Sequence, residues 1–166
     1  MAIILASKSP RRQELLRLLG VEFTVMTEDV DEHMDPGLSP EDEVARVSEL
    51  KAAAVLPLVG KEDLVVCADT IVVLDGEIMG KPHDEADACQ MLRKLSGRRH
   101  TVYTAVTVCA HGRRSTRVEA TRVCFRTLSE REIRAYVASG EPMDKAGAYG
   151  IQGRASLFVE IGRAHV

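Results

Sequence analysis

The stretch from Leu5 to Leu16 reads Leu-Ala-Ser-Lys-Ser-Pro-Arg-Arg-Gln-Glu-Leu-Leu, and it decides how the chain begins to fold. The apolar residues of 2–6 predict a short strand that ends at small hydroxyl residues. Ser9 is placed to cap a helix over 10–19, with Pro10 at its first position, where a missing N–H costs nothing. The expected buried stripe of this helix consists of Leu15, Leu16, Leu18 and Leu19.

The first turn of that helix gathers groups that bind anions. Its free backbone N–H groups, the hydroxyls of Ser7 and Ser9, and the guanidinium groups of Arg11 and Arg12 are expected to point toward one place. A polyphosphate suits such a site. A capped amphipathic helix with solvated arginines is the alternative interpretation of the same residues.

The rest of the chain alternates predicted strands and helices. Strands are expected over 21–26, 64–74, 100–111 and 114–126, and helices over 40–56, 84–95 and from 129 to about 140. Ser39-Pro40 and the capping box Ser129-x-x-Glu132 predict two of the helix starts, and Asp75-Gly76 predicts a hairpin turn. The pattern indicates an α/β fold with a mixed, twisted sheet flanked by helices.

Composition excludes several classes of protein. The 166 residues carry a net charge of -3 and only 4% aromatic residues, which argues against a nucleic-acid-binding module. No apolar run approaches the ~20 residues of a membrane helix, and no signal peptide is visible. The four cysteines lack any Cys-x-x-Cys pair, so we expect reduced thiols and a cytoplasmic protein.

Acidic residues supply the second candidate group. Asp69, in Ala68-Asp69-Thr70, interrupts an apolar strand, where a carboxylate is costly unless a partner or a metal satisfies it. It is placed to bind a divalent ion, position water or accept a proton. A turn aspartate that caps the next segment is the alternative. Glu32 is a candidate second acid for a metal, and a solvated loop acid is the equally open reading.

These motifs together resemble the Maf family of nucleoside triphosphate pyrophosphatases. The resemblance rests on Ser-Lys-Ser-Pro-Arg-Arg-Gln-Glu-Leu-Leu from Ser7, on Asp69-Thr70, on Leu-Ser-Gly-Arg-Arg-His ending at His100, and on Lys-Ala-Gly-Ala-Tyr-Gly-Ile-Gln-Gly from Lys145. It implies a Maf/ITPase-like fold with a nucleotide cleft between two lobes, and a homodimer. His100 is expected to be a structural residue at the start of its strand.

The resemblance also implies the chemistry: hydrolysis between the α- and β-phosphates, giving a nucleoside monophosphate and pyrophosphate. Asp69 is implied as the catalytic proton acceptor, and a divalent cation, Mg²⁺ or Mn²⁺, is implied as cofactor with Asp69 and Glu32 as ligands. The residues implied to hold the triphosphate are Ser7, Arg11, Arg12, Lys51 and Lys81.

Three positions distinguish branches of the family. Arg11, Thr70 and Gln152 resemble the branch that acts on dTTP and UTP, with modified pyrimidine nucleotides as further candidates, rather than the branch that acts on 7-methyl-GTP. The Gln152 amide offers a donor and an acceptor, which suits an uncharged pyrimidine edge. An inosine-triphosphate-type house-cleaning pyrophosphatase and a regulator of septum formation are the alternative functions.

The end of the chain departs from the family. We expect residues 1–160 to be a single Maf-like domain that lacks the family's C-terminal strand and helix. The last six residues, Ile-Gly-Arg-Ala-His-Val, correspond to the translation of ATC GGA AGA GCA CAC GTC, a run found in sequencing-library adapters. We therefore expect residues 161–166 to be a non-native tail.

Overall fold

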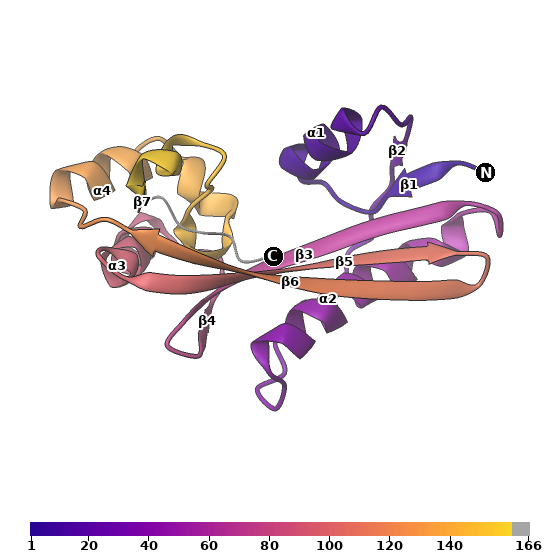
Figure 1. Cartoon of the computed structure of the whole chain (residues 1–166), viewed down its shortest axis with the longest axis horizontal. Helices are drawn as coiled ribbons and strands as arrows, with labels where there is room; N and C mark the ends of the chain where they lie inside the picture. Colours follow the sequence, from indigo (N-terminus) through magenta and orange to yellow (C-terminus); the bar gives the residue numbers. More distant parts are fainter. Residues whose placement is uncertain (161–166) are drawn as a thin grey trace. The chain divides into compact units, whose positions relative to one another are not determined.

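The computed structural model describes residues 1–160, which form two compact units (Figure 1). The first comprises Met1–Asp69 and Thr104–Glu119, and the second comprises Thr70–Tyr103 and the chain from Ala120 on. The expected non-native tail, 161–166, lies outside the described residues. Every helix within 1–160 is too short or too polar to cross a membrane.

The sheet is mixed, as the sequence predicts. Its strand order is β2-β1-β3-β5-β6-β7, and β4 pairs with β3 outside this path. β1 is parallel to β2 and β3, whereas β4 and β7 pair antiparallel with β3 and β6. The long strands β3 (Leu64–Leu74), β5 (Arg99–Ala110) and β6 (Arg113–Phe125) contribute residues to both units.

The first unit is built on two parallel crossovers. β1 (Ile3–Leu5) leads through α1 (Pro10–Leu18) to β2 (Thr24–Val25), and the chain returns through α2 (Pro40–Val55) and the short helix η1 (Leu56–Leu58) to β3 on the other side of β1. Right-handed crossovers in opposite directions place their helices on opposite faces of a sheet. Figure 1 shows α1 and α2 on opposite sides of the strands.

α2 forms as predicted and packs against the sheet. Ser39 caps it, accepting a hydrogen bond from the Asp42 N–H at 3.1 Å, and Pro40 occupies the first turn. Its apolar face closes the core of this unit. The buried members of that core are Ile4, Ala6, Ala52, Val55, Val65, Cys67 and Cys109.

α1 departs from prediction in two respects. It contains no buried residue, and Leu15, Leu18 and Leu19 are 51%, 77% and 72% exposed, so the expected buried stripe is wrong. A helical period identifies an apolar face but not whether another element covers it. Ser9 stands at the cap position, but its side chain makes no capping bond. Its N–H donates instead to the Ser7 hydroxyl at 3.3 Å.

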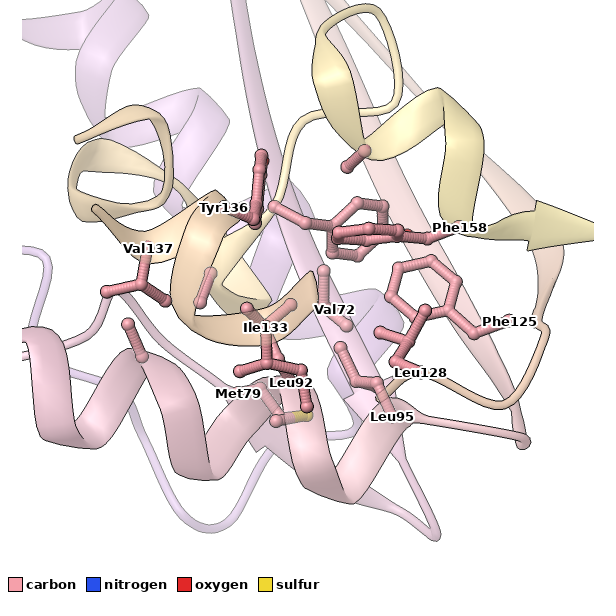
Figure 2. Packing of buried hydrophobic residues seen from close by; sticks show 14 of the residues in the cluster. Val72, Met79, Leu92, Leu95, Phe125, Leu128, Ile133, Tyr136, Val137 and Phe158 are labelled. Atoms are coloured by element: carbon pink, nitrogen blue, oxygen red, sulfur yellow. The ribbon is translucent and has the colours of Figure 1, made fainter. Parts of the chain in front are cut away.

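The second unit has a larger core (Figure 2). Its further elements are β4 (Glu77–Met79), α3 (Glu85–Leu95), α4 (Glu130–Val137), η2 (Glu141–Asp144), η3 (Ala146–Ala148), η4 (Arg154–Phe158) and β7 (Val159–Glu160). α3 packs against α4, and the predicted capping box at Ser129 and Glu132 is confirmed. Leu92, Leu95, Phe125 and Ile133 are almost completely buried at the centre.

His100 lies inside this second core. Its Nε2 atom is 2.7 Å from the Tyr149 hydroxyl, and its ring packs edge-on against Phe125 with centroids 5.0 Å apart. Burial lowers the pKa of His100 to about 4, so the imidazole is neutral at physiological pH. This geometry agrees with the structural role expected for it.

The buried imidazole predicts that acid destabilises the protein. The unfolded chain binds a proton at His100 near pH ~6.5, whereas the folded chain does so only near pH 4, so stability falls as pH drops between these values. We expect about 2 kcal/mol of unfolding free energy to be lost between pH 7.5 and 5. Urea unfolding at both pH values measures this, and His100→Gln should remove most of the difference. An equal loss in the variant would contradict the assignment.

Candidate functional site

Asp69 and Ser7 lie at the same edge of the sheet. β1 ends at Leu5, which pairs with Val66, and the parallel strand β3 runs on past it to Asp69. The Ala6 N–H donates to the Val66 carbonyl at 2.8 Å, so the segment leading to Ser7 stays beside β3. Both polar residues are buried. Ligands of open α/β sheets bind at this carboxyl edge.

Lys51 joins the two predicted acids. Its Nζ atom is 2.7 Å from Asp69 Oδ1 and 2.9 Å from Glu32 Oε1. Burial lowers the pKa of Lys51, but the two carboxylates outweigh that effect, so the pKa lies above its ordinary value and the ammonium stays charged. The two carboxylates therefore converge on one cationic point, although they lie 37 residues apart in the sequence.

Arg12 completes the polar cluster of this unit. Its guanidinium donates to the Ser7 hydroxyl at 3.3 Å, which also accepts from the Ser9 N–H. Burial lowers the pKa of Arg12, while the nearby Asp69 and Glu32 carboxylates act in the opposite direction. An arginine stays charged under such conditions. Arg12, Lys51, Asp69, Glu32 and Ser7 thus form one group, which we call the unit 1 polar cluster.

The loop that carries Glu32 is linked to α2 through the Glu43–Arg46 ion pair. Glu43, only 1% exposed, binds the Arg46 guanidinium through both carboxylate oxygens, at 2.9 and 2.7 Å. Arg46 in turn donates to the His33 carbonyl at 2.6 Å. A guanidinium that donates two hydrogen bonds to one carboxylate is held in a defined orientation. Through its bond to the His33 carbonyl, Arg46 ties the backbone at the residue after Glu32 to α2.

The unit 1 polar cluster fits a hard divalent cation. Mg²⁺ prefers oxygen ligands and is commonly held by one or two carboxylates together with substrate phosphates and water. Asp69 and Glu32 supply two carboxylates at one point, occupied here by the Lys51 ammonium. Within residues 1–160 no group of three or more His, Cys, Asp or Glu side chains could hold a metal alone. A cation bound to these two carboxylates would need further oxygen ligands, such as phosphate or water, to complete its coordination.

The remaining predicted residues divide between the units. Arg11 is half-buried on α1 beside Arg12. Thr70, Lys81 and Gln152 belong to the second unit. Thr70 is half-buried and follows Asp69 in β3, Lys81 is exposed after β4, and Gln152 is exposed in the loop between η3 and η4.

Sequence reasoning missed the residues that support the site. Glu43 lies in the first turn of α2, a position where any carboxylate is favoured by the helix dipole, so its sequence position does not mark it as part of a site. Its spacing to Arg46 is an i, i+3 pair, the one signal that pointed to a contact. The bond from Arg46 to the His33 carbonyl has no sequence signal, because it links a helix to a loop without periodicity.

Proteins of known families match nearly the whole chain. A family model described as Maf-like protein matches residues 2–164. A dTTP/UTP pyrophosphatase of Bacillus velezensis is 49% identical over 158 residues, which cover 95% of this chain and 83% of that protein. A dTTP/UTP pyrophosphatase of Pelotomaculum thermopropionicum is 51% identical over 160 residues, with the same coverage of each.

Two solved structures resemble the chain more distantly. A nucleoside-triphosphatase, dITP/XTP pyrophosphatase, of Mycobacterium abscessus aligns with a TM-score of 0.48 and 21% identity, over 75% of this chain and 74% of that one. The Ham1 protein of Staphylococcus aureus aligns with a TM-score of 0.49 and 17% identity, over 78% and 73%.

Proposed function

The chain belongs to the Maf-like family, and from that premise we propose that it is a pyrophosphatase of dTTP and UTP. The observation that carries the proposal is the identity of 49% and 51% to two dTTP/UTP pyrophosphatases across 95% of the chain. The proposed reaction is attack of water on the nucleotide, cleavage of the α–β phosphoanhydride, and release of a nucleoside monophosphate and pyrophosphate.

The unit 1 polar cluster supplies groups suited to this reaction. Arg12, with Ser7 bonded to it, offers hydrogen-bond donors and positive charge to the phosphate oxygens. Arg11 adds a second guanidinium on the same turn of α1. Lys51 contributes an ammonium whose charge is secured by the two acids it contacts. These cations stabilise the negative charge that grows on the leaving pyrophosphate.

Asp69 is proposed to orient the attacking water and accept its proton. Its carboxylate is fixed by β3 and by the 2.7 Å bond to Lys51, so it enters the reaction already positioned. A role as metal ligand alone is the second assignment for the same side chain. When bound by Asp69 and Glu32, Mg²⁺ or Mn²⁺ would neutralise phosphate charge as a Lewis acid.

Four further residues are proposed to take part in substrate selection, Arg11 from the first unit and Thr70, Lys81 and Gln152 from the second. Lys81 stands on the turn after β4 as a further phosphate-binding cation. Arg11, Thr70 and Gln152 are the proposed specificity residues, with the exposed Gln152 amide hydrogen-bonding the pyrimidine edge. A neutral amide favours an uncharged base over the cationic ring of 7-methylguanine.

We also propose that the enzyme works in the cytoplasm. Cys67, Cys89, Cys109 and Cys124 are all free thiols. Burial raises the pKa of Cys67 to about 11, which keeps this thiol protonated and unreactive. Reduced cysteines are typical of a reducing compartment, where nucleoside triphosphates are also abundant.

A panel of nucleotides tests the proposed function. Pyrophosphate release is measured from dTTP, UTP, CTP, ITP and 7-methyl-GTP with Mg²⁺ or Mn²⁺, and again after chelation with EDTA. We expect dTTP and UTP to be cleaved at least about tenfold more efficiently than the others, a difference of ~1.4 kcal/mol in transition-state binding, and the chelator to abolish release. Preference for ITP would instead support the house-cleaning alternative. Absence of release from every nucleotide would contradict an enzymatic role.

A further inference from the structure

The loop that carries Gln152 is fixed at both ends by side chains of α4 and η2. On one side of Gln152, the Gly150 N–H donates to the Tyr136 hydroxyl at 3.2 Å. On the other side, the Arg154 N–H donates to both carboxylate oxygens of Glu141, at 3.1 and 3.3 Å. A hydrogen bond from the Gly153 N–H to the Gly150 carbonyl, at 2.9 Å, closes the turn between them.

The two anchors are themselves joined. The Tyr136 hydroxyl donates to Glu141 Oε1 at 3.0 Å, so one carboxylate oxygen accepts from both Tyr136 and Arg154. Tyr136 is only 4% exposed and packs in the core against Phe158, with ring centroids 5.1 Å apart (Figure 2). The loop is therefore tied to the buried core of its unit.

Gly153 shows how closely the carboxylate approaches the loop. A Cβ atom at this position would lie 2.1 Å from Glu141 Oε1 and 2.7 Å from its Cδ. The φ of Gly153 is -107°, a value that every residue adopts. The obstacle to a side chain at Gly153 is therefore the Glu141 carboxylate and not the backbone conformation.

We propose that Glu141 is a positioning residue that sets the orientation of the Gln152 loop and thereby the choice of nucleotide base. The inference rests on the proposed function, since it takes Gln152 to contact the base. Charged acceptors make stronger hydrogen bonds than neutral ones, and removing one leaves its donors unpaired. Loss of the carboxylate removes two hydrogen bonds at once, one from the Arg154 N–H and one from the Tyr136 hydroxyl, so the loop samples orientations in which the amide no longer meets the base.

The first test compares Glu141→Ala with Glu141→Gln. The alanine variant should raise KM for dTTP and UTP about tenfold, with kcat changed much less, and should narrow the preference for these nucleotides over CTP and ITP. The glutamine variant keeps a carbonyl oxygen at the Oε1 position, which still accepts from the Tyr136 hydroxyl and the Arg154 N–H. It loses only the 3.3 Å contact of the Arg154 N–H with Oε2, and should behave within about threefold of the parent. Glu130→Ala is the matched control, because Glu130 lies on α4 and binds Arg93 and Arg134 but not the loop.

A substitution at Gly153 disturbs the same Glu141 carboxylate from the side of the loop. Gly153→Ala should displace the Glu141 carboxylate and reproduce the KM increase and the loss of preference. In the double variant with Glu141→Ala, the added methyl group has no carboxylate to displace. The double variant should then be no worse than Glu141→Ala alone, whereas independent effects would multiply.

Amide hydrogen exchange of the peptide spanning 149–158 supplies a readout that needs no activity. Exchange should quicken in Glu141→Ala and Gly153→Ala but not in Glu141→Gln or Glu130→Ala. If the parent chain cleaves no pyrimidine nucleotide, the proposed function fails, and the role of Glu141 in base selection fails with it. Hydrogen exchange then still decides whether Glu141 holds the loop. If the parent is active but Glu141→Ala matches Glu130→Ala in KM, preference and exchange, the positioning role is overturned.

Discussion

Replacing Asp69 with Asn should lower kcat/KM for dTTP by about 10²- to 10⁴-fold, the range expected when a positioned acid–base group is lost. The amide has the same shape and its oxygen still accepts a hydrogen bond from Lys51, now 2.7 Å from Asp69 Oδ1. Glu32 continues to neutralise the ammonium. The fold should therefore survive, and urea unfolding should show a change below about 1.5 kcal/mol.

Metal titration separates the two roles assigned to Asp69. If it accepts the proton, activity of Asp69→Asn stays low at every Mn²⁺ concentration, with the half-saturating concentration unchanged. If it only binds the metal, the half-saturating concentration rises and saturating Mn²⁺ restores much of kcat. Glu32→Gln is the comparison variant, because Glu32 contacts the same Lys51 from a more exposed loop. An Asp69→Asn protein with parental kcat/KM would remove Asp69 from both roles.

Much of the fold was predictable because local signals and burial agree. α2 begins at the predicted Ser39-Pro40 start, β3 covers the predicted 64–74, and α4 begins at the predicted capping box. Each of these combines a turn or cap residue with an apolar pattern of the right period. β2 is shorter than the predicted 21–26 strand, since only Thr24 and Val25 pair with β1.

The candidate site was predictable only in part. Short motifs identified Ser7, Arg12 and Asp69, because charged or hydroxyl residues beside apolar strands stand out in a sequence. The meeting of Lys51 with Glu32 depends on where a loop without periodicity folds back, which no local pattern specifies. Glu141 was missed for the same reason: its partners Tyr136 and Arg154 are reached through tertiary structure.

Gly147 joins the core of the second unit to the glycine-rich segment before Gln152. Its φ is +66°, a left-handed conformation that glycine adopts without strain, and a Cβ there would lie 2.9 Å from three carbon atoms of Val72. Val72 is 3% exposed and belongs to β3, so it has no room to move away. The Gly147 N–H also donates to the Gly80 carbonyl at 2.9 Å, beside Lys81.

Gly147→Ala should therefore lower the free energy of unfolding by about 2–5 kcal/mol. The left-handed backbone contributes ~1–2 kcal/mol and the overpacking against Val72 a further ~1–3 kcal/mol. Urea unfolding followed by circular dichroism measures the change. Gly140→Ala is the matched control, because Gly140 has a φ of +74° but no atom within 4 Å of an added Cβ.

Comparison with Gly140→Ala separates the cost of the contact with Val72 from the cost of the left-handed backbone. Gly140→Ala should lose only the conformational part, about 1–2 kcal/mol, so the difference between the two variants measures the contact with Val72. In a Val72→Ala background the Gly147→Ala substitution should cost less than in the parent, because the methyl groups it meets are gone. Equal losses in Gly140→Ala and Gly147→Ala would mean that backbone conformation alone requires glycine at 147. A larger loss at Gly147, relieved by Val72→Ala, would mean that packing against β3 fixes the path of the chain toward Gln152.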